Sequence, residues 1–237
     1  MKLAPYIHQL EWDSVFFGFS VAKVDIRSTD SCAEFLQREC EQKGVRLLYI
    51  YAHDAAAIAC AQRMGAHKIE DRITLTLNIS SPAPWLDVTG TLATTEDRND
   101  LLALAWQSAE QSRFKRDTNL PTHSWRELYR IWLDKSLAGE MADAILTERD
   151  YEGVAGMITV SDQNRVGKIG LFAVDKRARG RGLGSRLLYR ASAWFAMQGC
   201  QEATVVTQGD NDRALKAYRN SGYSIKEAVT VFHWWRD

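Results

Sequence analysis

The chain has 237 residues, 46% hydrophobic and 25% charged, and is long enough to bury a sizeable core in one large domain or two smaller ones. Its 30 basic residues balance its 30 acidic residues. This argues against a general nucleic-acid binder, which is basic over a whole domain. No apolar run reaches the length of about 18 residues that a membrane span needs, and the N-terminal stretch "MKLAPYIHQLEWDS" lacks a signal-peptide core. We therefore expect a cytoplasmic protein without a membrane span.

Repeated changes between strand-like and helix-like patterns mark the first part of the chain. The expected elements are one or two strands at 19–26, a helix at 31–43, a strand at 46–52, a helix at 55–64 and a strand at 72–79. The proline cluster "SSPAPW" follows the last strand. Because prolines of this kind mark a linker, we predict two domains, residues 1–85 and 86–237.

The second part reads as two helices, then strands, then alternating helices and strands. The first helix is expected at 96–112, followed by a loop at 112–123 and a second helix at 124–137 that is capped by Ser124. Three strands are expected next, at 141–148, 153–162 and 167–174. The remaining elements are a helix at 183–198, a strand at 202–208, a helix at 211–220 before Gly222 and a strand at 226–235. Two segments, "AIACAQRMGAHKIEDRITLTL" and "ALKAYRNSGYSIKEAVTVFHW", suggest a weak internal repeat of helix, glycine and strand.

The four cysteines form no recognisable metal or redox motif. Cys32, Cys40, Cys60 and Cys200 are scattered along the chain without a CxxC pair. We expect free, buried thiols in a reducing compartment and no bound metal; a zinc site and disulfide bonds remain the alternatives.

One basic, glycine-rich turn carries the strongest chemical signal. "VDKRARGRGLGSRLL" joins a predicted strand to a helix, and free N–H groups at a helix N-terminus bind anions. Glycines at 182 and 184 allow the main chain to approach a phosphate, and Arg179 and Arg181 can add charge-assisted hydrogen bonds. The Lys-Ser/Thr pair of a Walker loop is missing. A cradle for a cofactor diphosphate is favoured over a solvated basic turn or a nucleic-acid patch.

Arg179-x-x-Gly182-x-Gly184 resembles the (Q/R)xxGx(G/A) signature of the GCN5-related N-acetyltransferases, and "NDRALKAYRNSGY" resembles a second element of that family. The resemblance implies an α/β (α+β) fold with a mixed central sheet, and acetyl-CoA as co-substrate without a metal. Tyr218 would be the general acid that protonates the departing thiolate. The residues expected to bind acetyl-CoA are Ala173, Val174, Arg179, Gly180, Arg181, Gly182, Leu183, Gly184, Asn211 and Ala214. The alternatives are a core tyrosine for Tyr218 and a helix cap for Asn211.

The segment between the two helices, "QSRFKRDTNLPTHSW", lies over the acceptor pocket in this family. Arg113, Phe114 and Lys115 would suit an acceptor that carries a diphosphate and a flat base. A solvent-facing charged loop is the alternative, and His123 at its end is a further candidate for acceptor contact.

Three further stretches, "WDSVFFG", "AEQSRF" and "ELYRIWL", look like the dTDP-fucosamine N-acetyltransferases. That resemblance implies a nucleotide-linked, dTDP-type 4-amino-4,6-dideoxy sugar as acceptor, and an incomplete acetyltransferase-like domain at residues 1–85. It also places Glu70 at the position of a base that acts through water, with Asp71 as a rival.

Two other functions stay open: acetylation of another small amine or of a protein N-terminus, and a non-catalytic acetyl-CoA-binding module. The closing "VTVFHWWRD" is rich in aromatic residues around His233. We expect Trp234 or Trp235 to be buried against a neighbour, with a homodimer as the simplest arrangement. Nucleic acid is not an expected partner.

Overall fold

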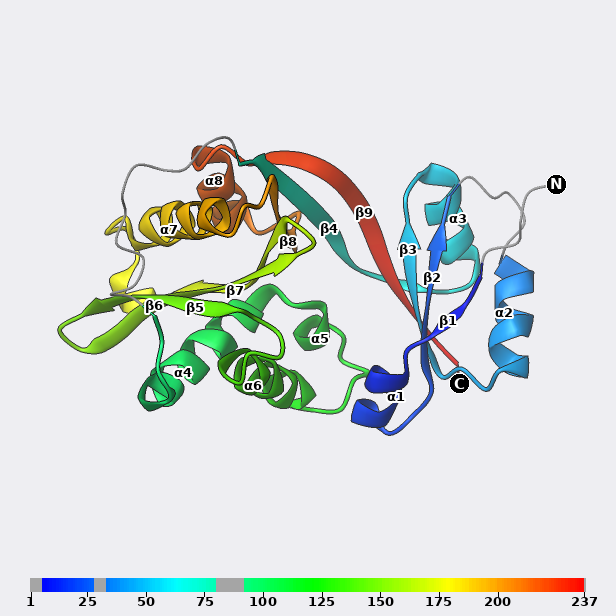
Figure 1. Ribbon diagram of the computed structural model, residues 1–237. Helices are drawn as coiled ribbons and strands as arrows, with labels where there is room; N and C mark the ends of the chain where they lie inside the picture. The colour runs from blue at the N-terminus through cyan, green and yellow to red at the C-terminus, as the bar shows by residue number, and fades with distance from the viewer. Residues whose placement is uncertain (1–5, 28–32, 80–91, 237) are drawn as a thin grey trace. The chain divides into compact units, whose positions relative to one another are not determined.

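The computed structural model describes residues 6–27, 33–79 and 92–236 and divides into two compact units (Figure 1). The first unit comprises Met1–Arg72, Arg116–Thr122 and Ala228–Asp237, and the second comprises Ile73–Lys115 and His123–Glu227. The expected boundary between residues 85 and 86 lies outside the described residues. Two long strands, β4 (His67–Asn78) and β9 (Ser224–Trp235), each contribute residues to both units.

Parallel strands form the centre of the first unit. β2 (Val21–Ile26) runs parallel to β3 (Leu47–Ala52), because the connection between them contains a helix. β3 is buried over most of its length, which explains its nearly continuous apolar sequence. The short β1 (His8–Gln9) and the end of β9 pair antiparallel with β2 and β3, respectively. The helices of this unit are α1 (Glu11–Phe17), α2 (Ala33–Gln42) and α3 (Ala55–Arg63).

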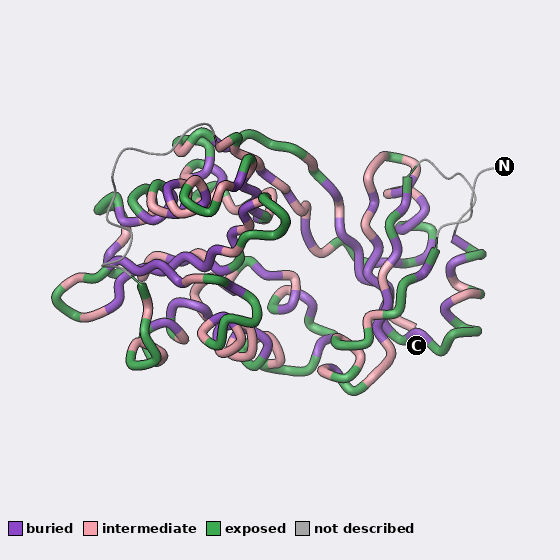
Figure 2. The backbone as a smooth tube through the Cα atoms, in the orientation of Figure 1, coloured by how far each residue is buried: buried purple, intermediate pink, exposed green. Residues whose placement is uncertain are grey.

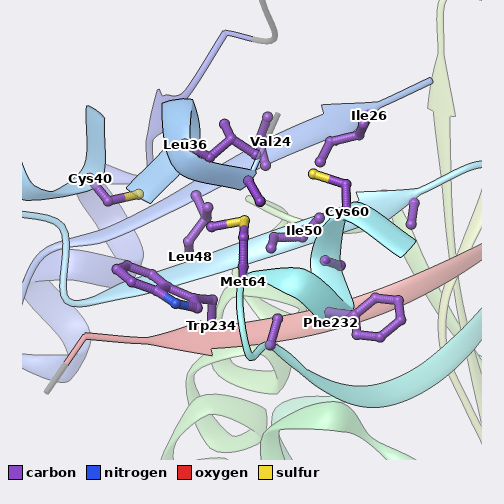
Figure 3. Close-up of a cluster of buried hydrophobic side chains, with 14 of the residues drawn as sticks. Val24, Ile26, Leu36, Cys40, Leu48, Ile50, Cys60, Met64, Phe232 and Trp234 are labelled. Atoms are coloured by element: carbon purple, nitrogen blue, oxygen red, sulfur yellow. The ribbon is translucent and has the colours of Figure 1, made fainter. Parts of the chain in front are cut away.

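The end of β9 completes the core of the first unit (Figure 3). Phe232 and Trp234 are 2% and 8% exposed and belong to one cluster with Leu48 and Ile50. Trp234 is therefore buried in the chain's own core, and burial against a neighbour stays a prediction for Trp235 alone. The homodimer itself stays a prediction.

A mixed sheet organises the second unit, with the strand order β4–β8–β7–β6–β5. Three helices lie on one face of this sheet: α4 (Arg98–Ser108), α5 (Arg113–Arg116) and α6 (Ser124–Leu137) (Figure 1). Two helices lie on the other face: α7 (Leu183–Met197) and α8 (Asp212–Asn220). The remaining strands are β5 (Ala144–Asp150), β6 (Gly153–Gln163), β7 (Val166–Val174) and β8 (Glu202–Gln208). Buried residues follow these central strands (Figure 2). The predicted mixed α/β fold is confirmed.

Local structure departs from expectation in three places. The short helix α5 occupies part of the predicted loop, and α1 was not predicted. His123 stands at the N-cap of α6 with a positive φ of 67°, so Ser124 is the first helical residue rather than the cap.

Cysteine chemistry also differs from expectation at one position. Cys40 and Cys200 are free and buried, and burial is the main cause that raises the pKa of each thiol to about 11. Cys60 is disulfide-bonded, so the expectation of a free thiol is wrong there. Within the described residues, no group of three or more His, Cys, Asp or Glu side chains is arranged to hold a metal ion. None of the helices described combines the length and the apolar character needed to cross a membrane.

Candidate active site

The neighbouring parallel strands β7 and β8 separate before they end. Their paired residues run from Val166 and Glu202 to Ile169 and Val205, whereas β7 continues to Val174 and β8 to Gln208. The divergence leaves one edge of β7 without a β8 partner. Backbone groups at this edge are therefore available to a ligand that lies between the strands.

An irregularity in the pairing of β6 with β7 lies at the point of divergence. The register shifts between Ile158 and Val160, and the Leu171 N–H donates to Oγ1 of the intervening Thr159 over 2.7 Å. A Cβ at position 170 would lie 2.7 Å from the same oxygen, so only glycine fits there without a shift. Bulges of this kind bend a strand and redirect its backbone next to active sites.

The predicted cradle forms at the N-terminus of α7. Gly182 is its N-cap residue, with φ of 78°, and Gly180 has φ of 79°. A side chain is disfavoured at both positions by backbone conformation rather than by lack of space, because nothing lies within 4 Å of either added Cβ. The first N–H groups of α7 have no partner within the helix and, with the positive end of the helix dipole, form an anion site.

Arg179 lies at the edge of this cradle. Its Nε donates to the Val174 carbonyl over 3.1 Å, which ties the side chain to the end of β7. Burial, followed by repulsion from the Arg213 guanidinium, lowers the pKa of Arg179. Two arginines that repel each other at one cavity would both be stabilised by a bound anion.

The turn that leads into the cradle is braced from α4, which the sequence did not indicate. The Gln107 side chain donates to Asp175 Oδ2 and accepts from the Lys176 N–H, each over 3.1 Å. The other Asp175 oxygen accepts from the Arg177 N–H over 2.9 Å. These contacts fix the backbone between β7 and the cradle.

A cavity of about 690 Å³ opens over the cradle, within the size range of cofactor sites. Most of the predicted cofactor residues line it: Ala173, Val174, Arg179, Gly180, Gly182, Leu183, Gly184, Asn211 and Ala214. Arg181 is not among the lining residues. Its guanidinium lies 3.8 Å from Asp150 and 3.4 Å from the Arg177 carbonyl oxygen.

A smaller cavity of about 280 Å³ adjoins the first one at the divergence of β7 and β8. The two share the lining residues Ser108, Phe172, Asn211 and Ala214. Tyr218 lines the smaller cavity, is 3% exposed and packs against the rings of Phe172 and Tyr223 at 5.8 and 5.7 Å. Burial, with a smaller contribution from Tyr223, raises the pKa of Tyr218. The phenol therefore stays protonated at neutral pH, and the same shift makes it a weaker acid than an exposed tyrosine.

Asn211 caps α8 and also lies where the two cavities meet. Its Oδ1 accepts from the Ala214 N–H over 3.2 Å, and its Nδ2 donates to Thr207 Oγ1 over 3.3 Å. The cap interpretation is therefore confirmed, and it is compatible with a place in the cavity wall.

The two candidates for the base lie in the first unit and differ in their surroundings. Glu70 on β4 is 6% exposed. Asp71 accepts hydrogen bonds from Lys68 over 2.8 Å and from Thr230 over 2.9 Å. Burial acts to raise the pKa of Asp71, but these two partners lower it on balance, which makes this carboxylate a weaker base. The choice of Glu70 as the base stays a prediction.

None of the three predicted acceptor residues, Arg113, Phe114 and Lys115, lines either cavity. Phe114 is 9% exposed and packs edge-on against Trp132 at 5.8 Å, and Trp132 lines the smaller cavity. The Arg113 guanidinium lies over the Phe114 ring at 4.7 Å, and Lys115 lies over the Trp125 ring at 4.9 Å. Trp132 and Tyr129 line the smaller cavity but were not predicted to do so, although their i, i+3 spacing in "ELYRIWL" indicates one helix face.

Asp117, in the segment predicted to contact the acceptor, instead anchors that segment within the first unit. Its Oδ2 lies 2.6 Å from His233 Nδ1 and accepts from Trp235 Nε1 over 3.0 Å. Burial raises the pKa of Asp117, but the hydrogen bonds, first that with His233, lower it on balance.

Comparisons with known proteins agree with this geometry. The chain is 28% identical to a dTDP-fucosamine acetyltransferase of Escherichia coli O6:H1 over 97% of this chain and 98% of that protein. It is 24% identical to the spore coat polysaccharide biosynthesis protein SpsD of Bacillus subtilis, over 59% of this chain and 48% of that protein. A GCN5-related N-acetyltransferase from Sphaerobacter thermophilus has a similar fold, with a TM-score of 0.67 and 17% identity, covering 98% of this chain and 76% of that one. Residues 100–223 match the acetyltransferase (GNAT) family, and the chain belongs to this family of N-acetyltransferases.

Proposed function

We propose that the enzyme transfers the acetyl group of acetyl-CoA to the 4-amino group of a nucleotide-linked, dTDP-type 4-amino-4,6-dideoxy sugar. The observation that carries this proposal is the junction of two cavities of different character at the divergence of β7 and β8. Similarity to a dTDP-fucosamine acetyltransferase over nearly the whole chain supports the choice of acceptor.

The larger cavity fits acetyl-CoA. The N-terminus of α7 and Arg179 would hold the diphosphate, with Arg213 as a further cation at the same cavity. The unpaired edge of β7 at Ala173 and Val174 would bind the pantetheine arm and polarise the thioester carbonyl. This places the thioester where the two cavities meet, beside Asn211.

The reaction needs a neutral amine and a proton for the sulfur. In the proposed mechanism Glu70, through a water molecule, takes a proton from the sugar ammonium. The amine nitrogen then forms a bond with the thioester carbon and releases its second proton to water, and the carbon–sulfur bond breaks. Tyr218 donates its proton to the departing thiolate and is reprotonated from solvent.

The protein is proposed to act in the cytoplasm, where acetyl-CoA is available. The first unit is proposed to be an incomplete acetyltransferase-like domain that contributes Glu70. The weak internal repeat has a structural counterpart in each unit, because α3 leads into β4 and α8 leads into β9. This common order of helix and strand supports the proposal.

Thiol release from acetyl-CoA tests the function, with dTDP- and UDP-linked 4-amino-6-deoxy sugars, spermidine and mixed amino acids as acceptors. We expect turnover with a nucleotide sugar and little with the free amines. Turnover confined to free amines would keep the acetyl-CoA site but refute the sugar acceptor. Binding of acetyl-CoA without turnover on any acceptor would favour a non-catalytic module.

A further inference from the structure

We propose that the aromatic side of the smaller cavity recognises the C6 methyl group of the acceptor and thereby selects a 6-deoxy sugar over its 6-hydroxy counterpart. This inference rests on the proposed function and assigns specificity within that site. The residues that carry it are Tyr129 and Trp132 on α6, Met141 after that helix and Leu171 on β7, which we call the methyl wall.

The smaller cavity suits one end of the acceptor rather than the whole molecule. Its volume of about 280 Å³ falls just below the range of about 300–1,000 Å³ that is typical of pockets for complete small ligands. With Tyr218 as the proposed acid in this cavity, the thioester sulfur lies beside it, and the amine that attacks the adjacent carbon enters with its immediate neighbours. In a 4-aminohexose the amine-bearing C4 is bonded to C3, which carries a hydroxyl, and to C5, which carries C6.

Three hydroxyl groups near the methyl wall each take part in a hydrogen bond within the protein. The Ser108 hydroxyl donates to the Ala105 carbonyl over 2.7 Å, and the Ser136 hydroxyl donates to the Trp132 carbonyl over 2.8 Å. Thr159 Oγ1 accepts from the Leu171 N–H over 2.7 Å. The side chains of the methyl wall present mainly carbon, so a ligand hydroxyl placed against them would lose hydrogen bonds to water, whereas a methyl group would not.

The lining residues from β8 and α8 have a different character. Thr207 and Gln208 at the end of β8 and Asn211 at the start of α8 supply polar side chains. The sheet face that carries α6 and the face that carries α8 are opposite each other in this unit (Figure 1). With the amine at Tyr218, the sugar can therefore direct its C3 hydroxyl to the polar side and C6 to the methyl wall.

No charged side chain occurs among the described residues that line the smaller cavity. Discrimination at C6 must therefore come from apolar contact and from the cost of burying an extra hydroxyl. A hydrophobic pocket rejects an added hydroxyl by about 100-fold in kcat/KM. We expect a preference of this size for the methyl group.

The test compares two dTDP-linked 4-amino-4-deoxyhexoses of the same configuration, one with a C6 methyl and one with a C6 hydroxyl. The variants are Trp132→Gln and Met141→Gln; Met141 is 48% exposed, so its replacement leaves folding intact. Met197→Gln is the matched control, because Met197 is 63% exposed on α7 and lines neither cavity. The kcat/KM ratio between the sugars is measured for each protein at saturating acetyl-CoA.

The proposal predicts a ratio of about 100 for the unmodified enzyme and for Met197→Gln, and a fall of at least tenfold in the ratio for Met141→Gln and Trp132→Gln. Equal use of the two sugars by the unmodified enzyme would overturn the methyl wall but leave the proposed function intact. A ratio that persists in both wall variants would do the same. Acetylation of neither sugar, with acetyl transfer to another amine, would overturn the proposed function as well.

Discussion

Replacement of Gly170 by alanine tests whether the bulge beside Thr159 sets the divergence of β7 and β8. The added Cβ would lie 2.7 Å from Thr159 Oγ1, so the Thr159 side chain must move and release the Leu171 N–H. An unsatisfied buried N–H costs about 1–3 kcal/mol, and overpacking adds about 1–3 kcal/mol. The free energy of unfolding should therefore fall by about 2–6 kcal/mol.

Urea unfolding followed by tryptophan fluorescence measures this change, with Gly184→Ala as a control. Gly184 lies within helix α7, and a Cβ added there makes ordinary contacts at 3.5 Å or more. This substitution should therefore stabilise the protein by about 0.4–1 kcal/mol. A double-mutant cycle isolates the collision. Thr159→Ala removes the oxygen, so Gly170→Ala should add little further loss in the Thr159→Ala background. Losses that add within about 0.5 kcal/mol would refute the collision as the reason for glycine.

Three further predictions concern single side chains. Tyr218→Phe keeps the buried ring but removes the proton donor, so kcat should fall about 10²–10⁴-fold while acetyl-CoA binding, measured by calorimetry, is retained; normal turnover would exclude Tyr218 as the general acid. Gln107→Leu removes the hydrogen bonds that Gln107 makes with Asp175 and Lys176. The KM for acetyl-CoA should therefore rise more than the KM for the acceptor. An equal rise in both KM values would argue against a role of Gln107 in the cradle. Asp117→Asn should destabilise the protein at neutral pH. The pKa of Asp117 is lower in the folded protein than in the unfolded chain, so the Asp117 carboxylate stabilises the fold above the unfolded pKa of about 3.9. This stabilisation is lost as the pH falls through the pKa of Asp117 in the folded protein. Unfolding curves at several pH values measure this difference, which should shrink in acid, and a difference independent of pH would contradict the assignment.

Local sequence was sufficient to predict the elements with strong periodicity and the turn with distinctive chemistry. The apolar run of β3 and the glycines around α7 each identify a local structure, because their conformations depend on nearby residues. Gly180 and Gly182 adopt positive φ, which glycine permits but does not dictate, since Gly184 lies within helix α7.

Long-range contacts could not be predicted from these patterns. Gln107 and Asp175 are 68 positions apart, and Asp117 and His233 are 116 positions apart, so no local periodicity links either pair. The bulge at Thr159 depends on how β6 and β7 align, and an alternating pattern does not specify such a shift. Arg181 was predicted to bind the cofactor because it is a basic residue beside the cradle, but its guanidinium lies near Asp150 instead.

A crystal structure with CoA and a dTDP-linked 4-amino-4,6-dideoxy sugar is the most direct test of the central claim. We expect the diphosphate of CoA at the N-terminus of α7, and the sulfur and sugar amine together at the junction of the two cavities, near the Tyr218 hydroxyl. A sugar bound away from the smaller cavity, with its amine out of reach of the sulfur, would contradict the account.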